Sequence, residues 1–378
     1  MKAKQYVLIL VITLGILFVI EALSSIAFYQ IKKPTNYFWS SSLETLNRFF
    51  FRDIKTPTLG YTKLREINEE ISNGNKVYPG YIVEPQLHHP KDFYFLSNVS
   101  DSIIIGCNES GFFNRWGSDK FGFRNPTNTH GNLSDILLIG DSFAEGACEN
   151  EGGTIAGYLR SENYLVANLA RSGTSALHQL ATYTEYKNVY PTKDVIWILF
   201  TGNDLHGLRQ EKTTRLVNYM SPYFNQDLAS KYEIVDRELR EFLDTEIENS
   251  NIRMERELPL IHRYNAGNYI DQIEAESKEI KLLIEVAETI NSRVNENNSS
   301  LKLVIINHFR FDHKIQDITS NALKTFAKEN NIPFLEFTRD FLEAHKNLYY
   351  SKTGQHFNAR GYKVIGSEIK NWLAETKN

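Results

Sequence analysis

The sequence predicts an α/β fold, in which a doubly wound parallel sheet is covered by helices on both faces and forms three layers. The central observation is the run ILLIG at 136–140, where four consecutive apolar residues end on a glycine. Such a run is too short for a helix and is rich in β-forming residues, so it predicts a buried strand. Beyond it, strand-like and helix-like segments alternate, as is typical of a parallel sheet.

Each further element of this sheet can be placed by its residue range. Apolar runs bounded by turn residues predict strands at 164–170, 194–200, 301–308 and 332–337. Helix-compatible spacing covers 154–160, 176–186 and 320–330, and a closing helix is expected over about 361–375. Together these segments predict a core domain over 133–378.

The interval 205–300 is far longer than the roughly 2–6 residues usual between elements of an α/β unit. It holds charged helical stretches, and the one over 269–294 has apolar residues near helical spacing. One helix here can be the ordinary crossover before the strand at 301–308. The remainder predicts a helical insertion, which is either a cap that shapes a substrate site or a solvated elaboration without a direct role.

Residues 30–132 have a different character, with many aromatics, prolines, glycines and asparagines. Short runs such as GYIVEP at 80–85 and DFYFLSN at 92–98 suggest strands and loops, and no long helical period is evident. We interpret this region as a lead-in segment that packs on the core.

The N-terminus carries an uncharged apolar stretch from Tyr6 to Ile20 that follows Lys2 and Lys4. Read on to Tyr29, it reaches the roughly 20 residues that a bilayer span requires. The favoured interpretation of 1–29 is a membrane anchor, which predicts a membrane-anchored protein with its catalytic domain outside the cytoplasm, periplasmic or extracellular. A cleaved signal peptide and a buried core helix are the alternatives.

The chain has two cysteines, Cys107 and Cys148. In an exported chain such a pair can be a disulfide, whereas in a cytosolic enzyme the two would more often be buried thiols. A bond between them would tie the segment after Ser142 to the lead-in. Two cysteines without a nearby histidine partner are too few for a structural zinc site, so no metal is expected.

The charge balance excludes one class of function. The 378 residues carry a formal net charge of −4, and no cluster of lysine and arginine interleaved with aromatics is present. Nucleic-acid binding is therefore not expected. No motif calls for a metal ion or an organic cofactor.

The chemistry-bearing residues follow the predicted strands. Gly140, Asp141 and Ser142 follow the first strand, and a helix is expected to begin beside them. A serine at the carboxyl end of a strand and the start of a helix lies where open α/β sheets bind ligands and where helix N–H groups can stabilise an anion. Ser142 is thus a candidate nucleophile, although a serine after an acidic residue is by itself more often a turn former or a helix cap.

Three other loops are expected at the same edge. Gly173 follows the second strand, Asn203 and Asp204 follow the third, and His356 precedes the closing helix. In a doubly wound sheet these loops converge, so Ser142 and His356 could share a pocket despite their separation in sequence.

This ordered set resembles the SGNH (GDSL-type) hydrolase superfamily. The matching blocks are Gly140-Asp141-Ser142, here followed by phenylalanine instead of leucine, then Gly173, then Gly202-Asn203-Asp204, and finally His356 with Asn358 and Gly361. The resemblance covers 136–378 apart from the interval 205–300, and it implies a flavodoxin-like hydrolase domain. The lead-in also looks like that of exported, membrane-anchored members, in which a cysteine-bearing loop and a GFRN-like segment precede this strand.

The resemblance implies a role for each block. Ser142 would attack an acyl carbonyl while His356 takes its proton. The backbone N–H groups of Ser142 and Gly173 and the side-chain amide of Asn203 would form the oxyanion hole. Asp141 and Asp204 would be structural residues near the site.

One position departs from the family pattern. Three residues before the histidine the family usually has an aspartate, which orients the imidazole, and this sequence has Thr353. The imidazole could instead be oriented by a backbone carbonyl near Thr353, by its hydroxyl, or by a carboxylate from elsewhere such as Asp340. A slow or inactive enzyme is the remaining alternative.

These observations lead to two functional hypotheses. The first is a serine esterase or O-acyltransferase that acts on a small acyl ester or an acylated glycan of the cell envelope. The second is a catalytically impaired domain that serves as a glycan-binding or assembly partner. It is suggested by Thr353, which stands where the family usually has an aspartate. A lysophospholipase or thioesterase ranks third.

Overall fold

A computed structural model describes residues 61–80, 94–109, 111–256, 277–309, 313–349 and 354–376. The chain divides into two compact units, Met1–Leu64 with Thr245–Asp271 and Arg65–Asp244 with Gln272–Asn378. The sheet and the candidate site belong to the second unit. None of the helices in the described ranges combines the length and the apolar character needed to cross a membrane. The predicted anchor within 1–29 lies outside the described residues.

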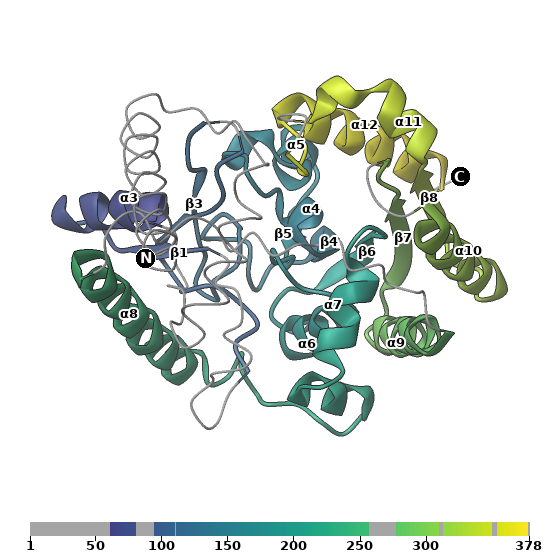
Figure 1. The fold of residues 1–378 in the computed structure, drawn as a ribbon. Helices are drawn as coiled ribbons and strands as arrows, with labels where there is room; N and C mark the ends of the chain where they lie inside the picture. Colours follow the sequence, from purple (N-terminus) through teal and green to yellow (C-terminus); the bar gives the residue numbers. More distant parts are fainter. Residues whose placement is uncertain are drawn as a thin grey trace, which may run out of the picture. The chain divides into compact units, whose positions relative to one another are not determined.

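The core is a sheet of five parallel strands in the order β5-β4-β6-β7-β8 (Figure 1). The strands are β4 Ser134–Gly140, β5 Val166–Asn168, β6 Thr192–Phe200, β7 Ser300–Ile306 and β8 Phe334–Phe337. Each overlaps one predicted strand. This strand order is that of a flavodoxin-like doubly wound sheet, so the predicted α/β fold class is confirmed.

The sheet is buried on both faces, because successive side chains of a strand point to opposite sides. In β4, Leu137 and Ile139 belong to one hydrophobic core, and Ile136 and Leu138 belong to the other. Figure 1 shows α6 and α9 along one side of the sheet and α5 and α12 along the other. The apolar residues of these helices complete the two cores and give the predicted three layers.

Most helices of the core domain overlap a predicted one, but the short helix Arg339–Ala344 was not predicted and the helix His313–Glu329 begins earlier than expected. They are α4 Ser142–Glu145, α5 Ile155–Ser161, α6 Ala176–Tyr186, α10 His313–Glu329, α11 Arg339–Ala344 and α12 Ala359–Glu375, with short 3₁₀ turns at Glu151–Gly153 and Lys346–Leu348. Side-chain caps fix several starts: Thr154 accepts a bond from Gly157 N at the start of α5, and Asn358 accepts one from Gly361 N at the start of α12.

The described residues of the interval 205–300 are largely helical, as expected. It contains α7 Asp204–Glu211, a 3₁₀ turn at Arg215–Met220, α8 Tyr232–Arg256 and α9 Ser277–Glu296. The α9 helix packs on the sheet and leads into β7, so it is the ordinary crossover. The first half of α8 binds the lead-in, since Asp236 accepts a hydrogen bond from Ser100 N at 2.7 Å.

The lead-in segment forms a small three-stranded sheet. Its strands are β1 Val77–Pro79, β2 Ile103–Ile105 and β3 Arg115–Gly117, with β1 parallel and β3 antiparallel to β2. Two expectations for this region are wrong. The helix α3, Tyr61–Ser72, was not predicted, although its Leu64, Ile67 and Ile71 follow helical spacing.

The second wrong expectation concerns the described part of the run at 92–98, which is not a strand. Its consecutive side chains Tyr94, Phe95 and Leu96 are all buried, so the run does not alternate between a buried and an exposed face. Two of its backbone N–H groups bond outside any sheet ladder, because Tyr94 N donates to the Gln226 side chain and Asn98 N donates to Gly122 O. Burial by aromatic packing therefore replaces strand pairing here.

Candidate active site

Ser142 lies at the junction of β4 and α4. Asp141 caps the helix, because its Oδ1 accepts a hydrogen bond from Phe143 N at 3.0 Å. The strand can turn here only because position 140 is glycine: a Cβ on Gly140 would lie 2.6 Å from the backbone oxygen of Ile198. The turn presents the Ser142 hydroxyl at the carboxyl end of β4, where the sequence placed it.

His356 reaches this hydroxyl from the loop before α12. Its Nε2 lies 2.9 Å from Ser142 Oγ. The loop is fixed on both sides, by a bridge between Tyr349 and Phe357 and by a hydrogen bond from Asn358 N to Leu348 O at 2.8 Å. The imidazole also packs on the ring of Phe143, with 5.3 Å between the ring centroids. Serine and histidine, 214 positions apart in sequence, therefore meet at hydrogen-bond distance.

The far nitrogen of the imidazole is held by Glu109. The Oε1 atom of Glu109 lies 2.9 Å from His356 Nδ1. Its Oε2 accepts backbone N–H bonds from His356 at 3.0 Å and from Gln355 at 3.1 Å. A carboxylate can only accept, so Nδ1 carries the proton and Nε2 is left with the lone pair that can accept the serine proton. Serine, histidine and glutamate thus form a connected triad.

This arrangement shifts the pKa values of His356 and Glu109 in the directions that favour their charged forms. Burial alone would lower the pKa of His356, but the hydrogen bond and charge of Glu109, with smaller contributions from Asp141 and Glu145, raise it above its ordinary 6.5. Burial alone would raise the pKa of Glu109, but the hydrogen bonds and charge of His356 and the N–H of Gln355 lower it below 4.5. The site therefore favours an imidazolium next to a carboxylate, which is the state that a general base passes through.

Sequence reasoning did not identify Glu109 as the orienting acid. Of the residues suggested instead, Asp340 lies in the first turn of α11 with an exposed side chain, and Thr353 lies outside the described residues. Glu109 lies 247 positions before the histidine, in the lead-in. The available signal was its position two residues after Cys107, which the expected disulfide would bring toward Ser142.

The predicted disulfide is present. Cys107 and Cys148 are bonded, with their Cα atoms 4.9 Å apart. The Sγ of Cys148 also lies 3.4 Å from His356 Nδ1. The two sulfurs and a ring nitrogen of His356 all lie within 4.8 Å of one another, as the ligands of a metal ion would. Metal coordination needs thiolates, and both sulfurs are used in the disulfide, so this cluster is not a metal site in the oxidised protein.

The expected oxyanion donors lie in the loops that flank Ser142. Strands β5 and β6 both pair with β4, so the loops that follow them meet at the same edge of the sheet. Gly173 has a φ of +76°, a conformation that favours glycine. Its loop is held against the end of β4, because Arg171 N donates to Gly140 O at 3.2 Å.

Asn203 lies at the start of α7, in the loop after β6. Within the described part of the chain, its buried Oδ1 has no hydrogen-bond partner, and its side chain does not cap the helix. The turn is fixed by the next residue, because Asp204 Oδ2 accepts a hydrogen bond from Phe200 N at 2.7 Å.

Asp141 and Asp204 are buried beside these reactive positions. Burial raises the pKa of Asp141 to about 6 and that of Asp204 well above its ordinary value, with the charge of Asp141 adding to the shift at Asp204. Two buried carboxyls that repel each other in this way do not both ionise readily. Their bonds to backbone N–H groups make them supports of the two turns.

A sequence model of the GDSL-like lipase/acylhydrolase family matches residues 138–364. This span includes Ser142, His356 and the loops of Gly173 and Asn203, but not Glu109. Among curated proteins no match is found.

Solved structures with a similar fold include three esterases. The psychrotrophic esterase EstA from Pseudoalteromonas sp. is 12% identical with a TM-score of 0.38, and the match covers 65% of this chain and 99% of that one. The acetyl xylan esterase AlAXEase is 11% identical with a TM-score of 0.36, covering 63% and 98%. A two-domain esterase active on acetylated mannans is 10% identical with a TM-score of 0.39, covering 65% and 50%. At these TM-scores we draw nothing further from the likeness.

Proposed function

This chain belongs to the GDSL-like lipase/acylhydrolase family, and from that premise we propose that it is a serine esterase whose acyl-enzyme forms on Ser142. The observation that carries the proposal is the connected triad, with 2.9 Å between Ser142 Oγ and His356 Nε2 and 2.9 Å between His356 Nδ1 and Glu109 Oε1. Serine hydroxyls become competent nucleophiles when an oriented base stands at this distance.

In the proposed reaction, Ser142 Oγ forms a bond to the acyl carbon as its proton passes to His356 Nε2. The negative charge on the carbonyl oxygen is met by the Ser142 and Gly173 N–H groups and the Asn203 amide. The ester C–O bond then breaks, and the leaving alcohol takes the proton from Nε2. Water, deprotonated by the same nitrogen, attacks the acyl-enzyme and releases the acid and free Ser142. Glu109 stabilises the imidazolium in both halves.

The nucleophile assignment is tested with an aryl acetate and an organophosphonate probe. Wild-type protein should release the aryl alcohol and should be labelled stoichiometrically at Ser142. The Ser142→Ala variant should lose both properties. Full labelling of this variant would refute the assignment.

We propose an acylated envelope glycan as the substrate. Two features support an extracytoplasmic location, namely the apolar stretch at 6–20 and the disulfide, since disulfides persist mainly in oxidising compartments. Acetate release from acetylated polysaccharides should exceed release from lysophospholipids and thioesters of equal concentration. A preference for the lipid or thioester panel would favour the third-ranked hypothesis. Acyl transfer to an added glycan, measured as acylated product, would identify a transferase.

The alternative of a catalytically impaired domain depended on Thr353 standing where the family has an aspartate. Glu109 supplies a carboxylate at His356 Nδ1, so this reason no longer holds. Binding of an oligosaccharide without labelling of Ser142 at any pH from neutral to alkaline would still favour the alternative.

A further inference from the structure

Glu109 lies on a short loop that is secured at its base. Gly106 N donates to Asn114 O at 2.9 Å, and Asn114 N donates to Cys107 O at 3.1 Å. Beyond this base, Asn108, Gly111 and Phe112 are exposed. Among the described residues of the tip, the links that reach the catalytic loops are the disulfide of Cys107 and the bonds of Glu109 itself to the histidine loop.

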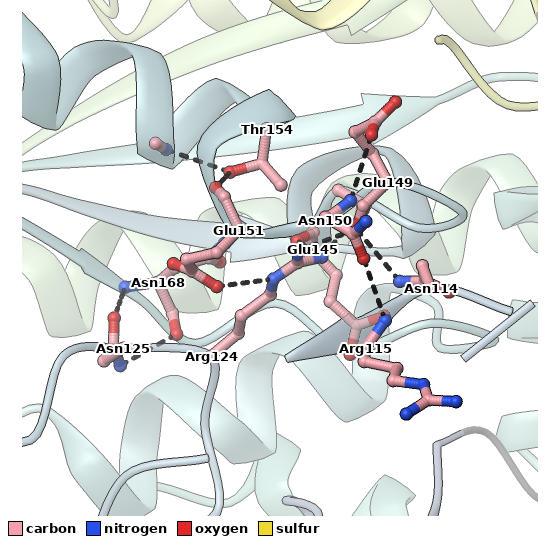
Figure 2. Close-up of polar contacts among 12 residues, drawn as sticks. Asn114, Arg115, Arg124, Asn125, Glu145, Glu149, Asn150, Glu151, Thr154 and Asn168 are labelled. Atoms are coloured by element: carbon pink, nitrogen blue, oxygen red, sulfur yellow. Dashed lines mark hydrogen bonds and ion pairs between the residues drawn. The ribbon is translucent and has the colours of Figure 1, made fainter. Parts of the chain in front are cut away.

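The segment that contains Cys148 is held by a separate set of hydrogen bonds and an ion pair around Arg124, shown in Figure 2. The guanidinium of Arg124, which is only 1% exposed, donates to Gly146 O and to Glu149 O, both at 2.8 Å. Its Nε also pairs with Glu151 Oε2 at 3.1 Å. These bonds bracket Cys148 in sequence, and none of them involves the disulfide.

The two ends of the disulfide are therefore unequal. If the bond opened, the segment of Cys148 would stay in place on Arg124, and the loop tip with Glu109 would lose its covalent link. Besides the bonds of Glu109 itself to the histidine loop, the described chain around Cys107 would be held by its backbone pairing with Asn114, which is anchored because Asn114 Nδ2 donates to Glu149 O at 3.0 Å. The part released is the part that carries the orienting acid.

Opening the bond would also change what faces the imidazole. Cys148 Sγ lies 3.4 Å from His356 Nδ1, which is the same nitrogen that faces the Glu109 carboxylate. A thiol or thiolate at this place can itself hydrogen-bond to Nδ1 and compete with the carboxylate.

We propose that the Cys107–Cys148 disulfide positions Glu109, so that the esterase activity depends on the oxidation state of this bond. This inference rests on the proposed function. Oxidised protein uses the full triad, and reduced protein uses a Ser142–His356 pair with a loosely placed acid. Reduction by a dithiol transfers two electrons and two protons to the bond, gives two cysteine thiols, and converts the dithiol to its own disulfide. Cys107 and Cys148 are positioning residues in this scheme.

The test compares the full chain before and after treatment with dithiothreitol. A thiol reagent should count none before and two afterwards. On an aryl acetate, reduction should lower kcat about tenfold if the freed loop keeps Glu109 in place for about a tenth of the time. KM should change little. The acid limb of the kcat/KM profile should move to lower pH, because the carboxylate raises the pKa of His356. Reoxidation should restore both.

Substitutions separate positioning from a general structural role. The Cys107→Ser/Cys148→Ser double variant should match the reduced wild type and be insensitive to dithiothreitol. In its background, Glu109→Gln should lower kcat less than it does in the disulfide-bonded protein, since the acid is already displaced.

Three results would overturn the proposal. One is a fully reduced protein that turns over within twofold of the oxidised form. Another is an equal effect of Glu109→Gln with and without the cysteines. The third is loss of near-ultraviolet circular dichroism on reduction, which would make the bond a staple of the fold. Failure of the proposed function is distinct, because oxidised wild type would then show neither turnover nor labelling of Ser142.

Discussion

Replacing Glu109 with glutamine should cost far more activity than the near identity of the two side chains suggests. In the native site, one carboxylate oxygen accepts two backbone N–H bonds and the other accepts the imidazole N–H. Glutamine has one oxygen and one NH₂ group to fill these two places. With its NH₂ group toward the backbone, both N–H donors would lose their acceptor.

The magnitude follows from counting these bonds. An unmet buried donor costs about 1–3 kcal/mol, so two of them cost about 2–6 kcal/mol, and the opposite orientation, with the glutamine oxygen toward the backbone, is preferred by about that amount. In that orientation its NH₂ group faces His356 Nδ1 and requires a lone pair there. The ring proton then moves to Nε2, which can no longer accept the proton of Ser142. A wrong tautomer of this kind lowers kcat by about 10⁴ in a serine protease, and we expect a loss of that order here.

The measurement is kcat/KM for an aryl acetate between pH 5 and 9. The acid limb of the wild type reports the pKa of His356 in the free enzyme, which lies above 6.5. Glu109 raises this pKa and burial lowers it, so removal of the carboxylate should move the residual acid limb to lower pH. Asp340→Asn is the matched control, since this exposed carboxylate should leave kcat/KM within about twofold. A Glu109→Gln variant that retains a tenth of the wild-type rate with an unshifted acid limb would refute the reasoning.

Four further outcomes are expected. Asn203→Ala should lower kcat by about 10²–10³, measured with an aryl acetate, while the protein keeps its wild-type melting temperature; an unchanged kcat would remove Asn203 from the oxyanion hole. Gly173→Ala should lower both kcat and stability, because φ is +76° there and alanine is strained in that conformation; chemical denaturation and kinetics check this. Asp204→Asn should raise the unfolding free energy at pH 7 by about 1–3 kcal/mol. The pKa of Asp204 is higher in the folded than in the unfolded protein, so this carboxyl destabilises the fold once the pH exceeds its pKa in the unfolded chain. The gain should vanish when denaturation is measured at pH 3. Arg124→Met should cost about 3–5 kcal/mol in the same assay, because the buried guanidinium satisfies two backbone carbonyls and Glu151, and a loss under 1 kcal/mol would contradict this.

The fold of the core could be predicted because its signals are local. The strand β4 is a run of apolar residues closed by Gly140, and the starts of α5 and α12 carry side-chain caps within three residues. In a parallel sheet the carboxyl ends of the strands share one edge, so the approach of Ser142 to the loop of His356 follows from topology once the strands are placed.

The orienting acid could not be predicted in this way. Glu109 has no regular element around it, and the strand before its loop has only three residues. Its contact with His356 spans 247 positions and is created by the packing of the lead-in on the core, not by a periodic pattern. The helix α3 was missed for a different reason, since its apolar positions are few and sparse among charged residues.

The division of the triad along the chain affects how fragments of this protein should be interpreted. A fragment that begins at Ser134, or at the first residue of the family match, would retain the hydroxyl and the imidazole and would leave the carboxylate behind. Slow turnover by such a fragment would reflect the removal of Glu109 and would not report the activity of the full chain. Any relative compared over the matched stretch alone would likewise show this chain as lacking an acid that it carries upstream.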